Sequence, residues 1–218
     1  MTSAPGCGLY GKTPAQGDFL RLHLAAGEAD ALDAWIDAGL AELDDEIAWG
    51  EGETAAPWRF AAAAGAVSPR AVAGALTASA DRVGRRFPCL LLAPLRLEPA
   101  AAVGCTPWFD AAEALLREAA AGALAGPGLG ERLASLAPPT EDDVDELELK
   151  GRSTPFGLFM EAHRAPDGRG VTLQAMLQAA PVPPGGAVWW RHDRDRTRLL
   201  VTPGAPRGDA FALLVAPA

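Results

Sequence analysis

Two pairs of predicted β-strands in this chain are separated by connections short enough for a hairpin. The first pair covers residues 72–79 and 87–95, joined by the polar, glycine-containing segment 80–86. The second pair covers 187–191 and 197–202, with a charged turn between them. Strands joined by so few residues pair antiparallel, because a parallel pair needs a crossover of about a dozen or more residues. The sequence therefore predicts a mainly antiparallel sheet and argues against a doubly wound parallel one.

Two longer segments show the three- and four-residue apolar spacing of amphipathic helices. The first, 30–47, has a strongly acidic outer face that includes Asp37, Asp44 and Asp45. The second, 107–123, begins at a Thr-Pro pair, which is typical of helix starts. We expect both helices to pack on the sheet, which gains further strands near 8–12 and 57–61. The predicted fold class is α+β, a single domain over 1–218, compatible with a longin- or profilin-like arrangement.

The remaining segments are less decisive. Short apolar runs look alike as strand or helix, so the type of 156–162 and of 171–178 stays open. Shorter helices are predicted at 130–136, from 140 to 149, and from Pro206 onward.

The composition narrows the classes of partner. A net charge of −9 over 218 residues argues against nucleic acid or an anionic membrane as the main partner. No apolar run approaches the roughly 20 residues of a membrane span, so we expect a cytoplasmic protein without membrane insertion. The three cysteines and three histidines show no metal-ligand spacing. We expect reduced thiols, no metal and no cofactor.

Residues 6–13 match the phosphate-binding pattern G-x-x-x-x-G-K-T. Such a loop works only where a buried strand delivers it to the N-terminus of a helix. The short segment before this match is broken by Pro5, and the apolar run 90–95 ends without the Asp that would hold Mg²⁺. We therefore expect neither ATP nor GTP to bind at Lys12.

Two short motifs carry candidate binding residues. In the turn 81–86 an Asp lies beside three arginines, which either grip a partner carboxylate or pair internally with that Asp. Trp189 and Trp190 are neighbours on a predicted strand, so their indoles point to opposite faces. We expect one indole in the core and the other half-covered or available to a partner, for which Trp is a favoured anchor.

Four groups of motif residues run in order along the chain: Gly8-Leu9-Tyr10-Gly11-Lys12 with Pro14 and Gly17-Asp18-Phe19, then Trp58-Arg59-Phe60, then Ser79 to Pro88 around Asp81-Arg82-Val83-Gly84-Arg85, and finally Trp189-Trp190. In order and spacing they resemble the TagF family, also called ImpM, of type VI secretion accessory proteins. Segment 127–185 adds little to the resemblance. The family usually has an apolar residue at Thr13, so the phosphate-loop match arises by a chance substitution. The candidate partner-binding residues are Lys12, Asp18, Trp58, Arg59, Asp81, Arg82, Arg85, Arg86, Trp189 and Trp190.

The resemblance implies a cytosolic regulator, not an enzyme, that restrains assembly of the type VI secretion machine after translation. The partner that it implies is the forkhead-associated-domain scaffold protein of the same system. The residues themselves leave an alternative open: a small hydrolase or phosphate-binding enzyme with a cleft built from Lys12, Asp18, Asp81 and Arg85. A structure with Asp18, Asp81 and Arg85 within hydrogen-bonding reach around an open pocket would favour the enzyme, whereas buried and mutually paired residues would be structural.

Overall fold

The computed structural model describes residues 6–44, 47–50, 57–123, 127–140, 152–156, 159–163, 173–193 and 196–217. Within these ranges, antiparallel strands form one continuous nine-stranded sheet in the order β2-β1-β5-β4-β3-β8-β9-β7-β6. The strands are β1 (Gly8–Gly11), β2 (Leu20–Leu22), β3 (Trp58–Ala62), β4 (Val72–Thr77), β5 (Cys89–Pro94), β6 (Arg152–Phe156), β7 (Phe159–His163), β8 (Ala187–His192) and β9 (Arg196–Thr202).

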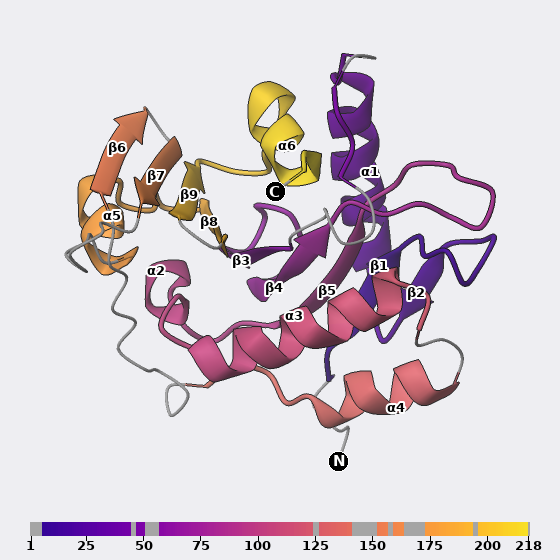
Figure 1. The fold of residues 1–218 in the computed structure, drawn as a ribbon. Coiled ribbons are helices and arrows are strands. Elements are labelled where there is room, and N and C mark those ends of the chain that lie inside the picture. The colour runs from indigo at the N-terminus through magenta and orange to yellow at the C-terminus, as the bar shows by residue number, and fades with distance from the viewer. Residues whose placement is uncertain are drawn as a thin grey trace.

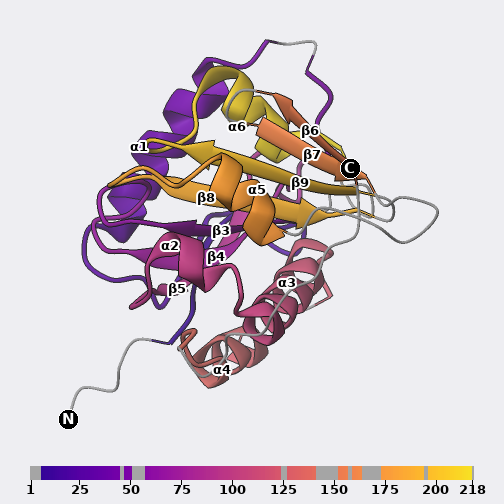
Figure 2. The ribbon, with the colours of Figure 1, turned by 90° about the vertical axis from the view of Figure 1, so that its left-hand side faces the viewer.

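Helices cover both faces of the sheet, which gives the molecule three layers (Figures 1 and 2). One face carries α1 (Glu28–Ala41) and α6 (Gly208–Val215). The opposite face carries α2 (Pro99–Ala102), α3 (Thr106–Ala120), α4 (Pro127–Ser135) and α5 (Leu173–Ala179). Among the helices of the described ranges, none has both the length and the apolar character needed to cross a membrane.

Alternation of side chains along the strands divides the core into two clusters. Tyr10 and Trp189 belong to the cluster under α1 and α6, whereas their neighbours Leu9 and Trp190 belong to the cluster on the other face. Because helices cover both faces, β4 is buried at every residue. Continuous burial of this kind is usual in parallel sheets. In this chain the short connections, and not the burial pattern, decide the strand direction.

The predicted α+β fold and its two hairpins are confirmed. β4 pairs with β5, with Thr77 opposite Cys89, and β8 pairs with β9, with His192 opposite Thr197. The described parts of the two segments of undecided type are now assigned. Phe156 ends β6, β7 covers 159–163, and α5 covers 173–179. The final helix predicted after Pro206 is α6.

Two expectations about helices need correction, and one helix was not predicted. The helix predicted over 30–47 ends at Ala41. Leu43 lies in irregular backbone beyond the helix, but it still packs against the core, and so it continued the apolar spacing. The helix predicted at 130–136 begins at Pro127, a residue that suits a first helical turn because it needs no backbone N–H. The single turn α2 has no counterpart in the prediction. The acidic helix predicted from 140 to 149 lies outside the described residues.

Candidate functional site

Two motifs that are far apart in the sequence meet at one end of the sheet, in residues 12–21 and 80–86, which we call the basic corner. β1 leads into the first segment and the β4–β5 hairpin forms the second, and β1 pairs with β5. The backbone N–H of Arg82 donates to the carbonyl of Gln16 at 3.2 Å. The Arg85 guanidinium donates to a second carbonyl of the 12–19 loop at 3.0 Å. The corner is therefore held together by direct hydrogen bonds.

Asp81 organises the corner from inside, because its side chain has no exposed surface. Oδ1 accepts the backbone N–H groups of Val83 at 3.0 Å and Arg85 at 2.9 Å. Oδ2 accepts Nε of Arg85 at 2.5 Å and lies 3.4 Å from Nζ of Lys12. Gly84 closes the turn with φ of +84°, a conformation that other residues rarely adopt. The internal Asp–Arg pair considered for this turn is thus present.

The surroundings of Asp81 act on its pKa in opposite directions. Burial alone would raise the pKa of this carboxyl, because it disfavours the charged form. Hydrogen bonds from Arg85 and from the backbone of Val83, together with the charge of Arg85, outweigh burial and lower the pKa to about 2. The carboxylate is therefore ionised throughout the physiological range.

Lys12 is the second buried charge of the corner, with a side chain that is 10% exposed. Its ammonium lies 4.8 Å from the ring centre of Phe19 and 5.7 Å from that of Phe87. Aromatic faces and a neighbouring carboxylate both stabilise an ammonium. Residues 8–11 form strand β1 and not a glycine loop at a helix N-terminus, so the geometry of a phosphate loop is absent at Lys12.

The outer surface of the basic corner is apolar and basic. Val83 is 70% exposed and Phe19 37%, and these two are the exposed large hydrophobic residues in the described part of the chain. Segments 12–21 and 80–86 together carry five bases and two acids, in a chain whose net charge is −9. The three arginines of the turn are all exposed: Arg82, Arg85 and Arg86. This combination suits a partner with an acidic surface and an apolar pocket.

The Trp58-Arg59 motif is buried and serves packing. Arg59 donates from Nε to Glu113 at 2.9 Å and from a terminal nitrogen to Asp110 at 2.6 Å, which ties β3 to α3. Nε1 of Trp58 donates to the carbonyl of Leu213 at 3.1 Å, which ties the same strand to α6. Neither side chain offers a contact surface of any size, since Trp58 is 0% and Arg59 7% exposed.

The expectation that one indole of the Trp189-Trp190 pair is half-covered or available is wrong. The two residues point to opposite faces as predicted, but they are 0% and 1% exposed. Trp189 stacks on Phe60 with ring centres 4.9 Å apart, and Trp190 meets Phe109 edge-on at 4.6 Å. Both are core residues because helices cover both faces of β8.

The four residues of the enzyme hypothesis do not converge. Lys12, Asp81 and Arg85 come together, and the buried carboxylate is shared between the two cations. Asp18 is exposed and makes no hydrogen bond or ion pair with Lys12, Asp81 or Arg85. The buried carboxylate is thus already neutralised by side chains of the chain itself.

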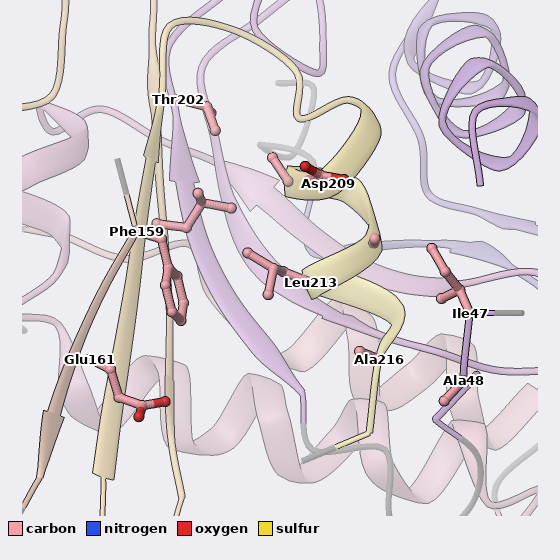
Figure 3. A pocket seen from close by; sticks show the side chains of 11 residues that line it. Ile47, Ala48, Phe159, Glu161, Thr202, Asp209, Leu213 and Ala216 are labelled. Atoms are coloured by element: carbon pink, nitrogen blue, oxygen red, sulfur yellow. The ribbon is translucent and has the colours of Figure 1, made fainter. Parts of the chain in front are cut away.

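A groove of about 890 Å³ crosses α6 and was not foreseen from the sequence (Figure 3). Figure 3 shows Leu213 at its centre, Phe159 on the side of β7, and Ile47 on the side of the chain beyond α1. The remaining lining residues are Ala48, Glu161, Leu200, Thr202, Asp209, Ala210, Ala212 and Ala216. None of the motif residues lines this groove, and its walls come from segments too far apart in sequence to leave a local pattern.

Comparisons with known proteins identify the family. The fold defines an α+β protein whose antiparallel sheet lies between two layers of helices. A family model described as the TagF N-terminal domain, type VI secretion system-associated, matches residues 8–136, which is more than half of the chain. This chain therefore belongs to the TagF family. The basic corner and α3 lie inside the matched range, whereas most of the groove lies beyond it.

A solved structure extends the likeness beyond the matched range. The chain is similar to PA0076 from Pseudomonas aeruginosa PAO1, known from a crystal structure, with 27% sequence identity and a TM-score of 0.62. The similarity covers 96% of this chain and 94% of PA0076. A search of curated proteins found no match.

Proposed function

We propose that this chain is a cytoplasmic, non-enzymatic regulator that restrains type VI secretion by binding the forkhead-associated-domain scaffold protein of the same system. Membership of the TagF family supports the link to type VI secretion. The observation that carries the binding role is the basic corner, where exposed Val83 and Phe19 lie among exposed arginines. Exposed apolar side chains together with arginines are common on protein-binding surfaces.

The basic corner is preorganised for binding. Asp81 fixes the turn with two backbone hydrogen bonds and one ion pair, so little conformational freedom is lost when a partner docks. Arg82 forms no ion pair with a described acid, so its guanidinium offers a bidentate fork to a partner carboxylate. Asp37 and Asp44 carry exposed carboxylates outside the basic corner. These carboxylates steer basic partner surfaces by long-range attraction.

The pairing at Asp81 disfavours the alternative of a hydrolase or phosphate-binding enzyme. A general base needs a carboxylate within reach of a substrate, and a pKa near the working pH. Asp81 has a side chain without exposed surface and a pKa of about 2. A phosphate site would need Lys12 free, yet its ammonium already faces that carboxylate at 3.4 Å.

The test is a matched pair of charge reversals on the two ends of β5. Arg82→Glu changes the basic corner, and Arg96→Glu makes the same change at the exposed residue beyond the opposite end of the strand. With purified scaffold protein in calorimetry, we expect Arg82→Glu to weaken binding about tenfold or more and Arg96→Glu to change it less than about twofold. Val83→Asp should act like Arg82→Glu, because it places a charge in the apolar centre.

Thermal unfolding of each variant must match the wild type before binding is compared. Arg85 is left in place, since it pairs with Asp81 and its loss would disturb the turn itself. Wild-type affinity in both folded corner variants would remove the basic corner as the contact surface. Failure of the wild-type protein to bind the scaffold at all would overturn the proposed function.

A further inference from the structure

The groove across α6 exposes a second apolar face of that helix. Phe211, Leu214 and Val215 bury one face of α6 in the core. Three helical residues that line the groove are three or four positions apart and share another face: Asp209, Ala212 and Leu213. Ala210 and Ala216, the latter in extended backbone just after the helix, complete the lining from this segment. Apart from Asp209, the groove-facing side of α6 is apolar, and an apolar helix face is normally buried. Within the described part of the chain, Ala212 and Leu213 on this side are only partly buried.

The charged residues that line the groove in the described part of the chain are all acidic. Glu161 and Asp209 are the charged residues among its described lining, and no described base lines it. Glu161 is neutralised by Arg198 at 2.8 Å and Arg196 at 3.4 Å. Asp209 is exposed and forms no ion pair with any described residue. The carboxylate of Asp209, at the rim of the apolar groove, is therefore available to pair with a basic side chain of another molecule.

We propose that this groove binds an amphipathic helix of a partner protein, with apolar side chains against Leu213 and Phe159 and a Lys or Arg opposite Asp209. Four alanines in the lining leave room for the backbone of a helix to approach closely. The surface is distinct from the basic corner: the corner lies near β1 and β5, the groove near β7 and β9, toward the other end of the sheet. The two surfaces also select opposite charges.

A helix from a partner fits the charges better than two other occupants do. A second copy of this chain, docked groove to groove, would bring two acidic rims together without a base between them. A fatty acid would place its carboxylate among the carboxylates of the rim. A helix with one base satisfies Asp209 and covers the apolar lining at the same time.

The experiment is a selection from a displayed library of amphipathic helices of about 16 residues, randomised at the apolar stripe and its flanks, against the full chain. We expect the enriched helices to share an apolar stripe with a Lys or Arg at a constant offset. Asp209→Lys should weaken their binding about fivefold or more and favour acidic helices in a repeated selection. The matched control is Glu131→Lys, the same charge change at an exposed residue of α4 on the opposite side of the sheet.

A steric variant locates the binding site. Ala212→Arg fills the groove and should abolish binding of the enriched helices, whereas Arg82→Glu in the basic corner should leave it unchanged. Absence of enriched helices, enrichment without a base, or unchanged affinity in folded Asp209→Lys would each overturn the proposal. Light scattering that shows a dimer abolished by Ala212→Arg would overturn it too, in favour of a second copy. Because no scaffold protein is present in the selection, these outcomes are separate from those that test the proposed function.

Discussion

The basic corner and the groove across α6 are built in opposite ways. In the corner, a fully buried carboxylate is bound by two cations and two backbone N–H groups, so the polar groups satisfy one another. In the groove, the lining is mainly apolar and the carboxylate of Asp209 has no ion-pair partner among the described residues. A surface of the first kind contributes to the stability of the fold, whereas a surface of the second kind contributes little until a partner covers it. Substitutions in the two regions should therefore have different signatures.

The largest contrast is expected between Asp81→Ala and Asp209→Ala. Removal of Asp81 leaves Lys12 buried without a carboxylate and releases the turn, so we expect the melting temperature to fall by on the order of 5–10 °C. Removal of Asp209 takes away only an exposed charge, and the melting temperature should stay within about 1–2 °C of the wild type. Differential scanning calorimetry measures both. Equal shifts in the two variants would show that the corner is no more structural than the groove.

Acid unfolding adds to the comparison, because protonation of His192 and protonation of Asp81 destabilise the folded chain in different pH ranges. Burial and the charge of Arg59 lower the pKa of His192 to about 4, so the folded chain keeps this imidazole neutral. The unfolded chain binds the proton below about pH 6.5, and stability should fall by about 3 kcal/mol between about pH 6.5 and 4. Asp81, with its pKa lowered to about 2, contributes stability that is present above about pH 4 and is lost as the pH falls toward 2.

Denaturant unfolding at a series of pH values separates the two windows. His192→Gln should flatten the upper window and leave the lower one. Asp81→Ala should flatten only the lower window, and Asp209→Asn should alter neither. A lower window that persists in Asp81→Ala would mean that another carboxyl, and not the corner, governs acid unfolding below about pH 4.

The smallest expected effect is that of nucleotide. Lys12 is engaged by Asp81 and follows a β-strand, so Mg-ATP or Mg-GTP at millimolar concentration should leave the melting temperature unchanged. Isothermal calorimetry should detect no heat of binding beyond dilution. Micromolar, Mg²⁺-dependent binding that Lys12→Met abolishes would restore the phosphate-loop interpretation of residues 6–13.

Local sequence patterns predicted more of the structure inside residues 8–136, the range that the family model matches, than beyond it. The motif at 79–88 predicted a hairpin and left open whether its arginines pair internally with the Asp. The pair of Asp81 and Arg85 that the structure shows is local, four residues apart. The resemblance to the TagF family rested mainly on residues inside the range that the family model matches, 8–136. Beyond that range the local patterns were weaker, and the types of β7 and α5 needed the tertiary structure.

The sequence alone determined that β4 pairs antiparallel with β5 and β8 with β9, because a connection of a few residues leaves a strand no other way to return. It also determined that Trp189 and Trp190 face opposite sides, because side chains alternate along any strand. Only the tertiary structure decided that both sides are covered, that Arg59 pairs with Asp110 across 51 positions, and that the described residues cover one face of α6 only in part. The physical reason is that periodicity reports the direction in which a side chain points, whereas burial depends on what the rest of the chain brings to that side.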